Sequence, residues 1–213
     1  MDTRALYDSA GRENRLWSAL ETAGEFQMGE APPQKAMRKI AAILEQERIP
    51  YAVAGALALN QHGYQRLTVD LDLLLTRDGL AALKARVLGL GYLERFPGSK
   101  GLRDTENNVA IDVLLTGDFP GDGKPKPVAF PDPIEGSAAI GGVRFLKLGK
   151  LVELKLASGI SAPHRMKDLT DVLELIRAAR LPRELSRELD QSVREKYDEL
   201  WLLAASAPPD EDY

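Results

Sequence analysis

Two aspartates with a single apolar residue between them stand in a segment whose other residues read as a buried strand. Asp70 and Asp72 flank Leu71, and the apolar run 73–75 follows directly. Strand side chains alternate between the faces of a sheet, so both carboxylates point the same way, about 7 Å apart. Like charges held this close repel each other, and a bound cation relieves the repulsion. The pair therefore predicts a metal site, with a solvent-facing pair on an edge strand as the alternative.

A third carboxylate stands in a later strand of similar character. Asp112 lies in the segment Val-Ala-Ile-Asp-Val-Leu-Leu at 109–115. If this strand is a neighbour of the one that carries Asp70 and Asp72, three carboxylates converge at one edge of the sheet. An oxygen-only, acidic set suits Mg²⁺ or Mn²⁺. Two such ions about 4 Å apart assist phosphoryl-type transfer, and Asp112 is then both a ligand and the candidate base.

A glycine precedes the first aspartate by fifteen positions and ends the strand expected over 51–54. Gly55 stands at a strand-to-helix junction, where a glycine lets the backbone approach a phosphate closely. An ordinary tight turn is the alternative. The segment from Gly55 to Asp72 thus combines a candidate phosphate turn with two candidate metal ligands.

Hydrophobic spacing predicts the elements that must position these residues. The expected strands lie at 51–54, 68–75, 91–96, 101–104 and 109–115, with a hairpin at 138–148. The expected helices lie at about 13–23, 34–47, 56–62 and 77–90, followed by three helices from 150 to about 203, the third starting at 181–182. The glycine- and proline-rich stretch 117–133 is expected to be a loop. Leu80, Leu83, Val87 and Leu88 are expected to form the inner face of the helix at 77–90.

These elements predict an α+β fold, with a mixed twisted sheet and flanking helices followed by a helical bundle. The predicted division is a helical arm at 1–34, a core at 35–148, a helical region at 149–205 and a disordered tail at 206–213.

Composition narrows the chemistry further. The 213 residues include no cysteine and only two histidines, which excludes thiolate catalysis and makes a zinc site implausible. The net charge of −4 argues against a basic surface over the whole molecule. We expect no signal peptide and no membrane span, because no apolar run approaches the roughly 20 residues required. The expected location is the cytoplasm.

The spacing of these residues resembles a known family. Gly55-Ala56, thirteen residues, Asp70-Leu-Asp72 and a later Ile-Asp112-Val are similar to the polymerase-beta-type nucleotidyltransferase superfamily. The string at 62–72, with its Arg-x-Thr-x-Asp-Leu-Asp order, looks like small bacterial members such as the AbiEii-like toxins. Lys155 on one expected helix, with Arg-Met-Lys-Asp-Leu-Thr-Asp at 165–171 on the next, is similar to a second motif of that group. The resemblance covers about residues 50–177.

The resemblance implies a nucleotidyltransferase fold and an enzyme that moves a nucleoside monophosphate from an NTP, such as ATP, to a hydroxyl acceptor (EC 2.7.7 type). It implies Mg²⁺ or Mn²⁺ as cofactor, and catalytic metal ligands at Asp70, Asp72 and Asp112. The nucleotide-binding residues that it implies are Gly55, Ala56, Arg66, Thr68, Lys155 and Asp168. The acceptor is tRNA, with an antitoxin as partner, or a small hydroxylated molecule such as an antibiotic. The net negative charge disfavours a large RNA-binding surface, whereas the basic clusters at 144–155 and 164–167 are compatible with RNA as the acceptor.

One position departs from the family pattern, and several others have simpler explanations. Ala56 stands where the family usually has a serine, so the hydroxyl that commonly holds a phosphate is missing. A catalytically silent module that binds nucleotide or a partner is therefore the alternative function. Lys155 could instead cover the core with its stem, Asp168 could form a surface ion pair, and Arg66 could brace its loop. His62 is expected to be structural.

Overall fold

The computed structural model describes residues 23–206, and its strands form one seven-stranded mixed sheet. The strand order is β3-β4-β5-β2-β1-β7-β6. The strands are β1 (Tyr51–Val53), β2 (Asp70–Leu75), β3 (Tyr92–Glu94), β4 (Leu102–Asp104), β5 (Val109–Leu115), β6 (Ser137–Ile140) and β7 (Val143–Leu146). The predicted hairpin is formed by β6 and β7, which are joined by the glycine pair at 141–142, and the stretch 117–133 forms a loop, as predicted.

Strand β2 lies at the centre of the sheet because most of its side chains need burial. Its residues Leu71, Leu73, Leu74 and Leu75 are completely buried. A strand that is buried on both faces must have apolar side chains on both faces, as this run does. It pairs with β1 in the antiparallel and with β5 in the parallel direction. The two partly exposed positions at its start, Asp70 and Asp72, therefore stand out against an apolar background.

Within residues 23–206, helices α2, α3 and α4 accompany the sheet, and each begins for a local reason. Helix α2 (Pro32–Gln46) has proline in its first turn, where a missing N–H does no harm. Helix α3 (Gly55–Gln61) begins directly at the glycine that ends the β1 turn. Helix α4 (Arg77–Val87) is capped by Thr76, whose hydroxyl accepts a hydrogen bond of 2.9 Å from the Gly79 amide.

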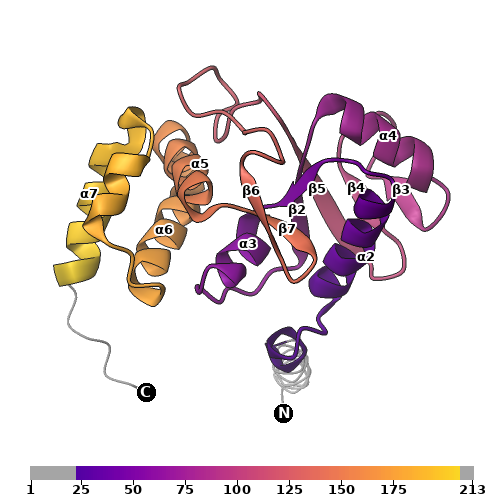
Figure 1. The fold of residues 1–213 in the computed structure, drawn as a ribbon, viewed down its shortest axis with the longest axis horizontal. Coiled ribbons are helices and arrows are strands. Elements are labelled where there is room, and N and C mark those ends of the chain that lie inside the picture. Colours follow the sequence, from indigo (N-terminus) through magenta and orange to yellow (C-terminus); the bar gives the residue numbers. More distant parts are fainter. Residues whose placement is uncertain (1–22, 207–213) are drawn as a thin grey trace, which may run out of the picture.

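The helical end of the molecule consists of α5 (Leu148–Ser161), α6 (Met166–Ala178) and α7 (Gln191–Ser206). These helices stand side by side at one end of the molecule, with α5 nearest the sheet (Figure 1). Every residue of α5 from Leu151 to Gly159 is buried. This central helix also encloses polar side chains, and these require partners inside the protein.

The fold-class prediction of a mixed sheet with flanking helices and a helical C-terminal region is confirmed. The described residues contain no helix that is long and apolar enough to cross a bilayer. Most of the predicted arm at 1–34, including most of the helix expected at 13–23, and nearly all of the predicted tail lie outside the described residues. The domain boundaries stay predictions.

Three details of the sequence prediction are wrong. The third C-terminal helix is split into a 3-10 helix, η2 (Arg183–Glu188), and α7, because Leu189 is extended and Asp190 starts a new helix. Strand β2 begins at Asp70 rather than at residue 68, because Thr68 turns its hydroxyl to Asp70 instead of pairing with a strand. Leu88 is 39% exposed, since its backbone leaves the helix there.

The start of α7 depends on a side-chain cap. The Asp190 carboxylate accepts hydrogen bonds from the amide of Ser192 at 2.9 Å and from its hydroxyl at 2.6 Å. These two bonds hold the pKa of Asp190 below its usual value. A depressed pKa means that the stabilisation is present above the pKa of the unfolded chain and is lost as the pH falls through the folded value.

We expect Asp190→Ala to lower the free energy of unfolding by about 1 kcal/mol at pH 7, the usual effect of losing a cap. The difference from the unaltered protein should be smaller at pH 3, because a stabilisation that comes from a lowered pKa starts to be lost below the pKa of the unfolded chain. Urea unfolding at the two pH values measures both effects. Asp198→Ala is the matched control, because Asp198 lies on the same helix in an exposed ion pair and should change stability less. Equal losses for both variants would contradict the capping role.

Candidate functional site

A cleft of about 530 Å³ lies between the start of β2 and the helices α5 and α6. Every residue that the sequence singled out as a site residue lines it: Gly55, Ala56, Arg66, Thr68, Asp70, Asp72, Asp112, Lys155 and Asp168. These residues come from segments more than one hundred positions apart in the chain. Their meeting in one cleft is a property of the fold, while their roles in binding stay predictions.

One wall of the cleft is acidic. Asp72 of β2 is the direct register partner of Asp112 of β5, in neighbouring parallel strands, and such strands lie about 4.8 Å apart. Asp70 stands two residues earlier and on the same face of β2. Burial raises the pKa of Asp72 to about 6, and the charges of Asp70 and Asp112 raise it as well. The three carboxylates are therefore close enough to repel one another.

The chain partly neutralises this wall with its own side chains. The Thr68 hydroxyl donates a hydrogen bond to Asp70, and the guanidinium of Arg95 forms an ion pair with Asp112. Within residues 23–206, no three histidine, aspartate or glutamate side chains are grouped tightly enough to hold a metal ion as they stand. The donor set nevertheless suits Mg²⁺ or Mn²⁺, because it is made of carboxylate oxygens that repel one another. Arg95 was not predicted from the sequence, since nothing in its local pattern indicates a partner seventeen residues away.

The glycine turn and the acidic wall touch each other. Gly55 has a φ of +59°, and a Cβ placed on it would lie 1.8 Å from the Oδ2 atom of Asp72. No other residue type fits there without displacing the carboxylate or straining the backbone. Because Gly55 has no side chain, the Asp72 carboxylate can lie directly against the strand-to-helix turn.

The opposite wall carries a buried network of ion pairs. Lys155 of α5 is 7% exposed, and its Nζ donates to Asp168 Oδ1 at 3.0 Å and to Asp171 Oδ2 at 2.7 Å. Asp168 also accepts from the Ser158 hydroxyl at 2.6 Å and from Arg165 Nε at 2.9 Å. Burial alone would raise the pKa of Asp168, but Lys155, Ser158 and Arg165 outweigh it and hold the pKa below its usual value.

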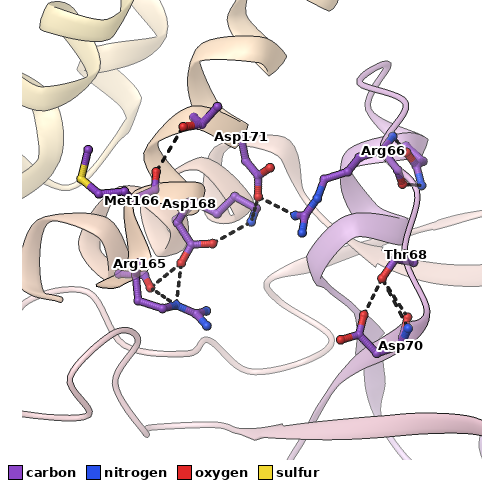
Figure 2. A network of polar contacts seen from close by, with 11 residues as sticks. Arg66, Thr68, Asp70, Arg165, Met166, Asp168 and Asp171 are labelled. Carbon is purple, nitrogen blue, oxygen red and sulfur yellow. Dashed lines mark hydrogen bonds and ion pairs between the residues drawn. The ribbon is translucent and has the colours of Figure 1, made fainter. Parts of the chain in front are cut away.

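A residue from the acidic side completes this network. Arg66, in the loop before β2, reaches across to α6 and pairs with Asp171 at 2.7 Å (Figure 2). The structure thus corrects two alternatives left open by the sequence. The side chain of Lys155 is 9% exposed and its charged end is paired inside the protein rather than in water. Asp168 and Asp171 are buried rather than part of exposed surface pairs.

The sequence places Asp171 in the motif at 165–171 but did not assign it to the site, although a signal was available. It follows Asp168 by three positions on α6, so both carboxylates lie on one helix face. Had Lys155 on the preceding helix been recognised as buried, its charge would have indicated that this face of α6 packs inward. His62 behaves as expected for a structural residue, since its Nε2 lies 2.7 Å from the Leu146 carbonyl oxygen.

Comparison with known proteins gives structural similarity only. No family model matches the chain, and no curated protein matches it. Among solved structures it is similar to ANT(2")-Ia in complex with adenylyl-2"-tobramycin, with 15% identity, a TM-score of 0.49 and coverage of 81% of this chain and 96% of that one. A protein from H. pylori, assigned provisionally as a nucleotidyltransferase, has 18% identity, a TM-score of 0.45 and coverage of 81% and 91%. JHP933 from Helicobacter pylori has 18% identity, a TM-score of 0.38 and coverage of 81% and 89%.

We expect Gly55→Ala to destabilise the protein by about 1–2 kcal/mol from the left-handed backbone alone, and by more because of the contact with Asp72. Urea unfolding measures the total. The same substitution in an Asp72→Ala background should cost less, because the clashing carboxylate is gone while the backbone strain remains. An equal cost in both backgrounds would show that Asp72 does not pack against the turn.

We expect Lys155→Met to lower the free energy of unfolding by about 3 kcal/mol at pH 7, because Asp168 and Asp171 remain as buried charges. The loss should be smaller at pH 3. The low pKa of Asp168 means that its stabilisation is lost as the pH falls. Lys196→Met is the matched control, since Lys196 pairs with the exposed Glu199 at the surface of α7. A similar small loss for both lysines would contradict the buried network.

Proposed function

We propose that this protein is a metal-dependent nucleotidyltransferase that moves a nucleoside monophosphate from an NTP to a hydroxyl acceptor. The observation that carries the proposal is the polarity of the cleft. Three carboxylates line one wall, the cations Lys155 and Arg165 line the other, and Arg66 reaches across to that wall from the loop before β2. A magnesium-bound triphosphate has the complementary polarity, with the cation on one side and phosphate oxygens on the other.

Asp70, Asp72 and Asp112 would hold Mg²⁺ or Mn²⁺. When bound, the ion supplies charge neutralisation at the phosphates and lowers the pKa of the attacking hydroxyl. The raised pKa of Asp72 supports this assignment, because a group that is crowded by two other carboxylates gains from a nearby cation. Arg95 must leave Asp112 for the third carboxylate to take part.

The cationic wall would bind the phosphates. Arg66, Lys155 and Arg165 carry three positive charges against the two carboxylates Asp168 and Asp171, so one positive charge is left over. Arg66 and Lys155 would contact phosphate oxygens, with Asp168 orienting Lys155. Thr68 holds Asp70, and the turn at Gly55 and Ala56 lets the backbone approach the phosphate chain.

In the transfer step, the acceptor oxygen attacks the α-phosphorus of the NTP. Asp112 takes the proton from the acceptor hydroxyl, the new oxygen–phosphorus bond forms, and the bond to the β-phosphate oxygen breaks. Pyrophosphate leaves with the electron pair of that bond. The cationic wall stabilises the charge that develops on this leaving group.

Further cationic side chains in the cleft favour an anionic acceptor. The cleft lining includes the cationic side chains of Lys100, Arg165 and Lys167. Clustered cations recognise phosphodiester backbones and repel polycationic antibiotics. We therefore place tRNA first among the acceptors, as for an AbiEii-like toxin with an antitoxin as its partner, and a small hydroxylated molecule second.

A silent binding module of the same fold is the competing function, and Ala56 favours it. This position offers a phosphate its backbone N–H but no hydroxyl. The silent module would hold a nucleotide in the same cleft and release no pyrophosphate.

The test is transfer of label from each α-³²P-labelled NTP to purified tRNA and to small hydroxylated acceptors, with Mg²⁺ or with EDTA. We expect Mg²⁺-dependent labelling of tRNA, and a loss of roughly a thousandfold for Asp72→Asn, because several kcal/mol of charge stabilisation disappear. Asp198→Asn on α7 is the control and should transfer normally. Binding of Mn²⁺ followed by electron paramagnetic resonance should weaken in Asp72→Asn and not in the control.

Nucleotide binding without label transfer for any NTP would support the silent module and contradict the enzyme. Labelling of a small acceptor in place of tRNA would contradict the choice of acceptor. Unchanged transfer by Asp72→Asn would contradict the site.

A further inference from the structure

The two walls of the cleft are joined by one ion pair. In the part of the chain that the structure describes, Arg66 and Asp171 form the only salt bridge between residues up to 148 and residues from 149 onward. The pair measures 2.7 Å, and Asp171 is 2% exposed. A pair with one buried and one partly exposed partner at this place ties the loop before β2 to helix α6.

Asp171 acts on the cleft without lining it. Arg66 and Lys155 both line the cleft, whereas Asp171 lies behind them. Its Oδ2 atom accepts from both cations at 2.7 Å. One carboxylate oxygen thus determines where two cleft cations can stand relative to each other (Figure 2).

The backbone of Arg66 is fixed separately from its side chain. The Asn60 side chain accepts from the Arg66 amide at 2.5 Å and donates to its carbonyl oxygen at 3.1 Å. With the backbone held at α3, the partner of the guanidinium decides the direction of the side chain. That partner is Asp171.

Asp168 cannot replace Asp171 in this function. Asp168 also accepts from Lys155, but its other oxygen accepts from Ser158 and Arg165. Both residues belong to the helical wall of the cleft, which is formed by α5, α6 and the turn between them. Loss of Asp171 would leave Lys155 with Asp168 and leave Arg66 without its partner. The two carboxylates therefore have different roles, although both contact the same lysine.

We infer that Asp171 is a positioning residue, which orients Arg66 and Lys155 toward the bound triphosphate and ties the loop at 63–69 to the helical wall. The orienting part rests on the proposed function, whereas the tie between the loop and α6 is independent of it. A neutral amide keeps the shape of the side chain but not the charge that two cations share. Asp171→Asn should therefore slow the chemical step more than it weakens nucleotide binding, since a cleft that loses a negative charge does not repel a triphosphate more strongly.

The first experiment measures amide hydrogen exchange of the full chain without nucleotide. Asp171→Asn should speed exchange in the loop at 63–69 by roughly tenfold, as expected from the loss of one charge-assisted hydrogen bond. Glu174→Gln is the matched control, because it removes the same charge one turn further along α6 from an exposed pair with Arg177. It should leave the loop unchanged.

Arg66→Met tests the same tie from the other side and stays informative if Asp171→Asn folds poorly. It should speed exchange of the loop to the same degree, and adding Asp171→Asn should speed it no further. Arg66→Lys should restore part of the protection, because the charge remains. Unchanged exchange in Arg66→Met, or faster exchange throughout the sheet in Asp171→Asn, would overturn the tie.

The second experiment compares kcat for transfer with the Kd of a non-hydrolysable NTP. Asp171→Asn should lower kcat roughly tenfold while the Kd changes less than about threefold. An unchanged kcat, or a fall in kcat that matches the fall in folded protein, would overturn the orienting role. If the unaltered protein neither binds nor transfers any nucleotide, the proposed function and the orienting role are both wrong, and the exchange result still decides whether Asp171 holds the loop.

Discussion

A lysine charge inside helix α5 constrains the helical end of this molecule. A charge that is removed from water must be paired, and the idealised cost of leaving it alone is many kcal/mol. Lys155 therefore needs Asp168 and Asp171, and both must come from the same face of α6. This requirement fixes the rotation of α6 against α5 more precisely than apolar packing does, because hydrogen bonds are directional.

The same requirement extends to the sheet through Arg66. Asp171 has one positive partner from α5 and another from the loop that leads into β2. That loop carries Thr68, which in turn holds Asp70. Two ion pairs, the backbone of the loop and one hydrogen bond thus connect the buried lysine to Asp70 on the acidic wall. The close approach of Gly55 to Asp72 links the strand-to-helix turn to the same acidic wall.

Much of this arrangement was readable from the sequence, and the reason is periodicity. Alternation in the segments of Asp70, Asp72 and Asp112 indicated both the strands and the face of the sheet, and apolar spacing indicated most of the helices. What the sequence could not give were contacts between distant segments. Whether Lys155 meets water or a carboxylate depends on where α6 packs, and the partner of Asp112 depends on the path of the chain after β3. The break at Leu189 was hidden, because apolar spacing continues across it.

The chain's own side chains partly neutralise both walls of the cleft, and this lowers the cost of keeping like charges together before a substrate binds. Uncompensated carboxylates at the sheet edge and uncompensated cations on the helices would each weaken the fold. Arg95 at Asp112 and the two aspartates at Lys155 remove much of that cost. A ligand with a cation on one side and phosphates on the other then exchanges one set of ion pairs for another, instead of desolvating isolated charges. The exchange is easier at Arg95 than at Lys155, since Arg95 is half exposed and Lys155 is buried. If the cleft binds a metal-bound triphosphate as proposed, the acidic wall is therefore the side expected to rearrange, and the cationic wall the side expected to stay in place.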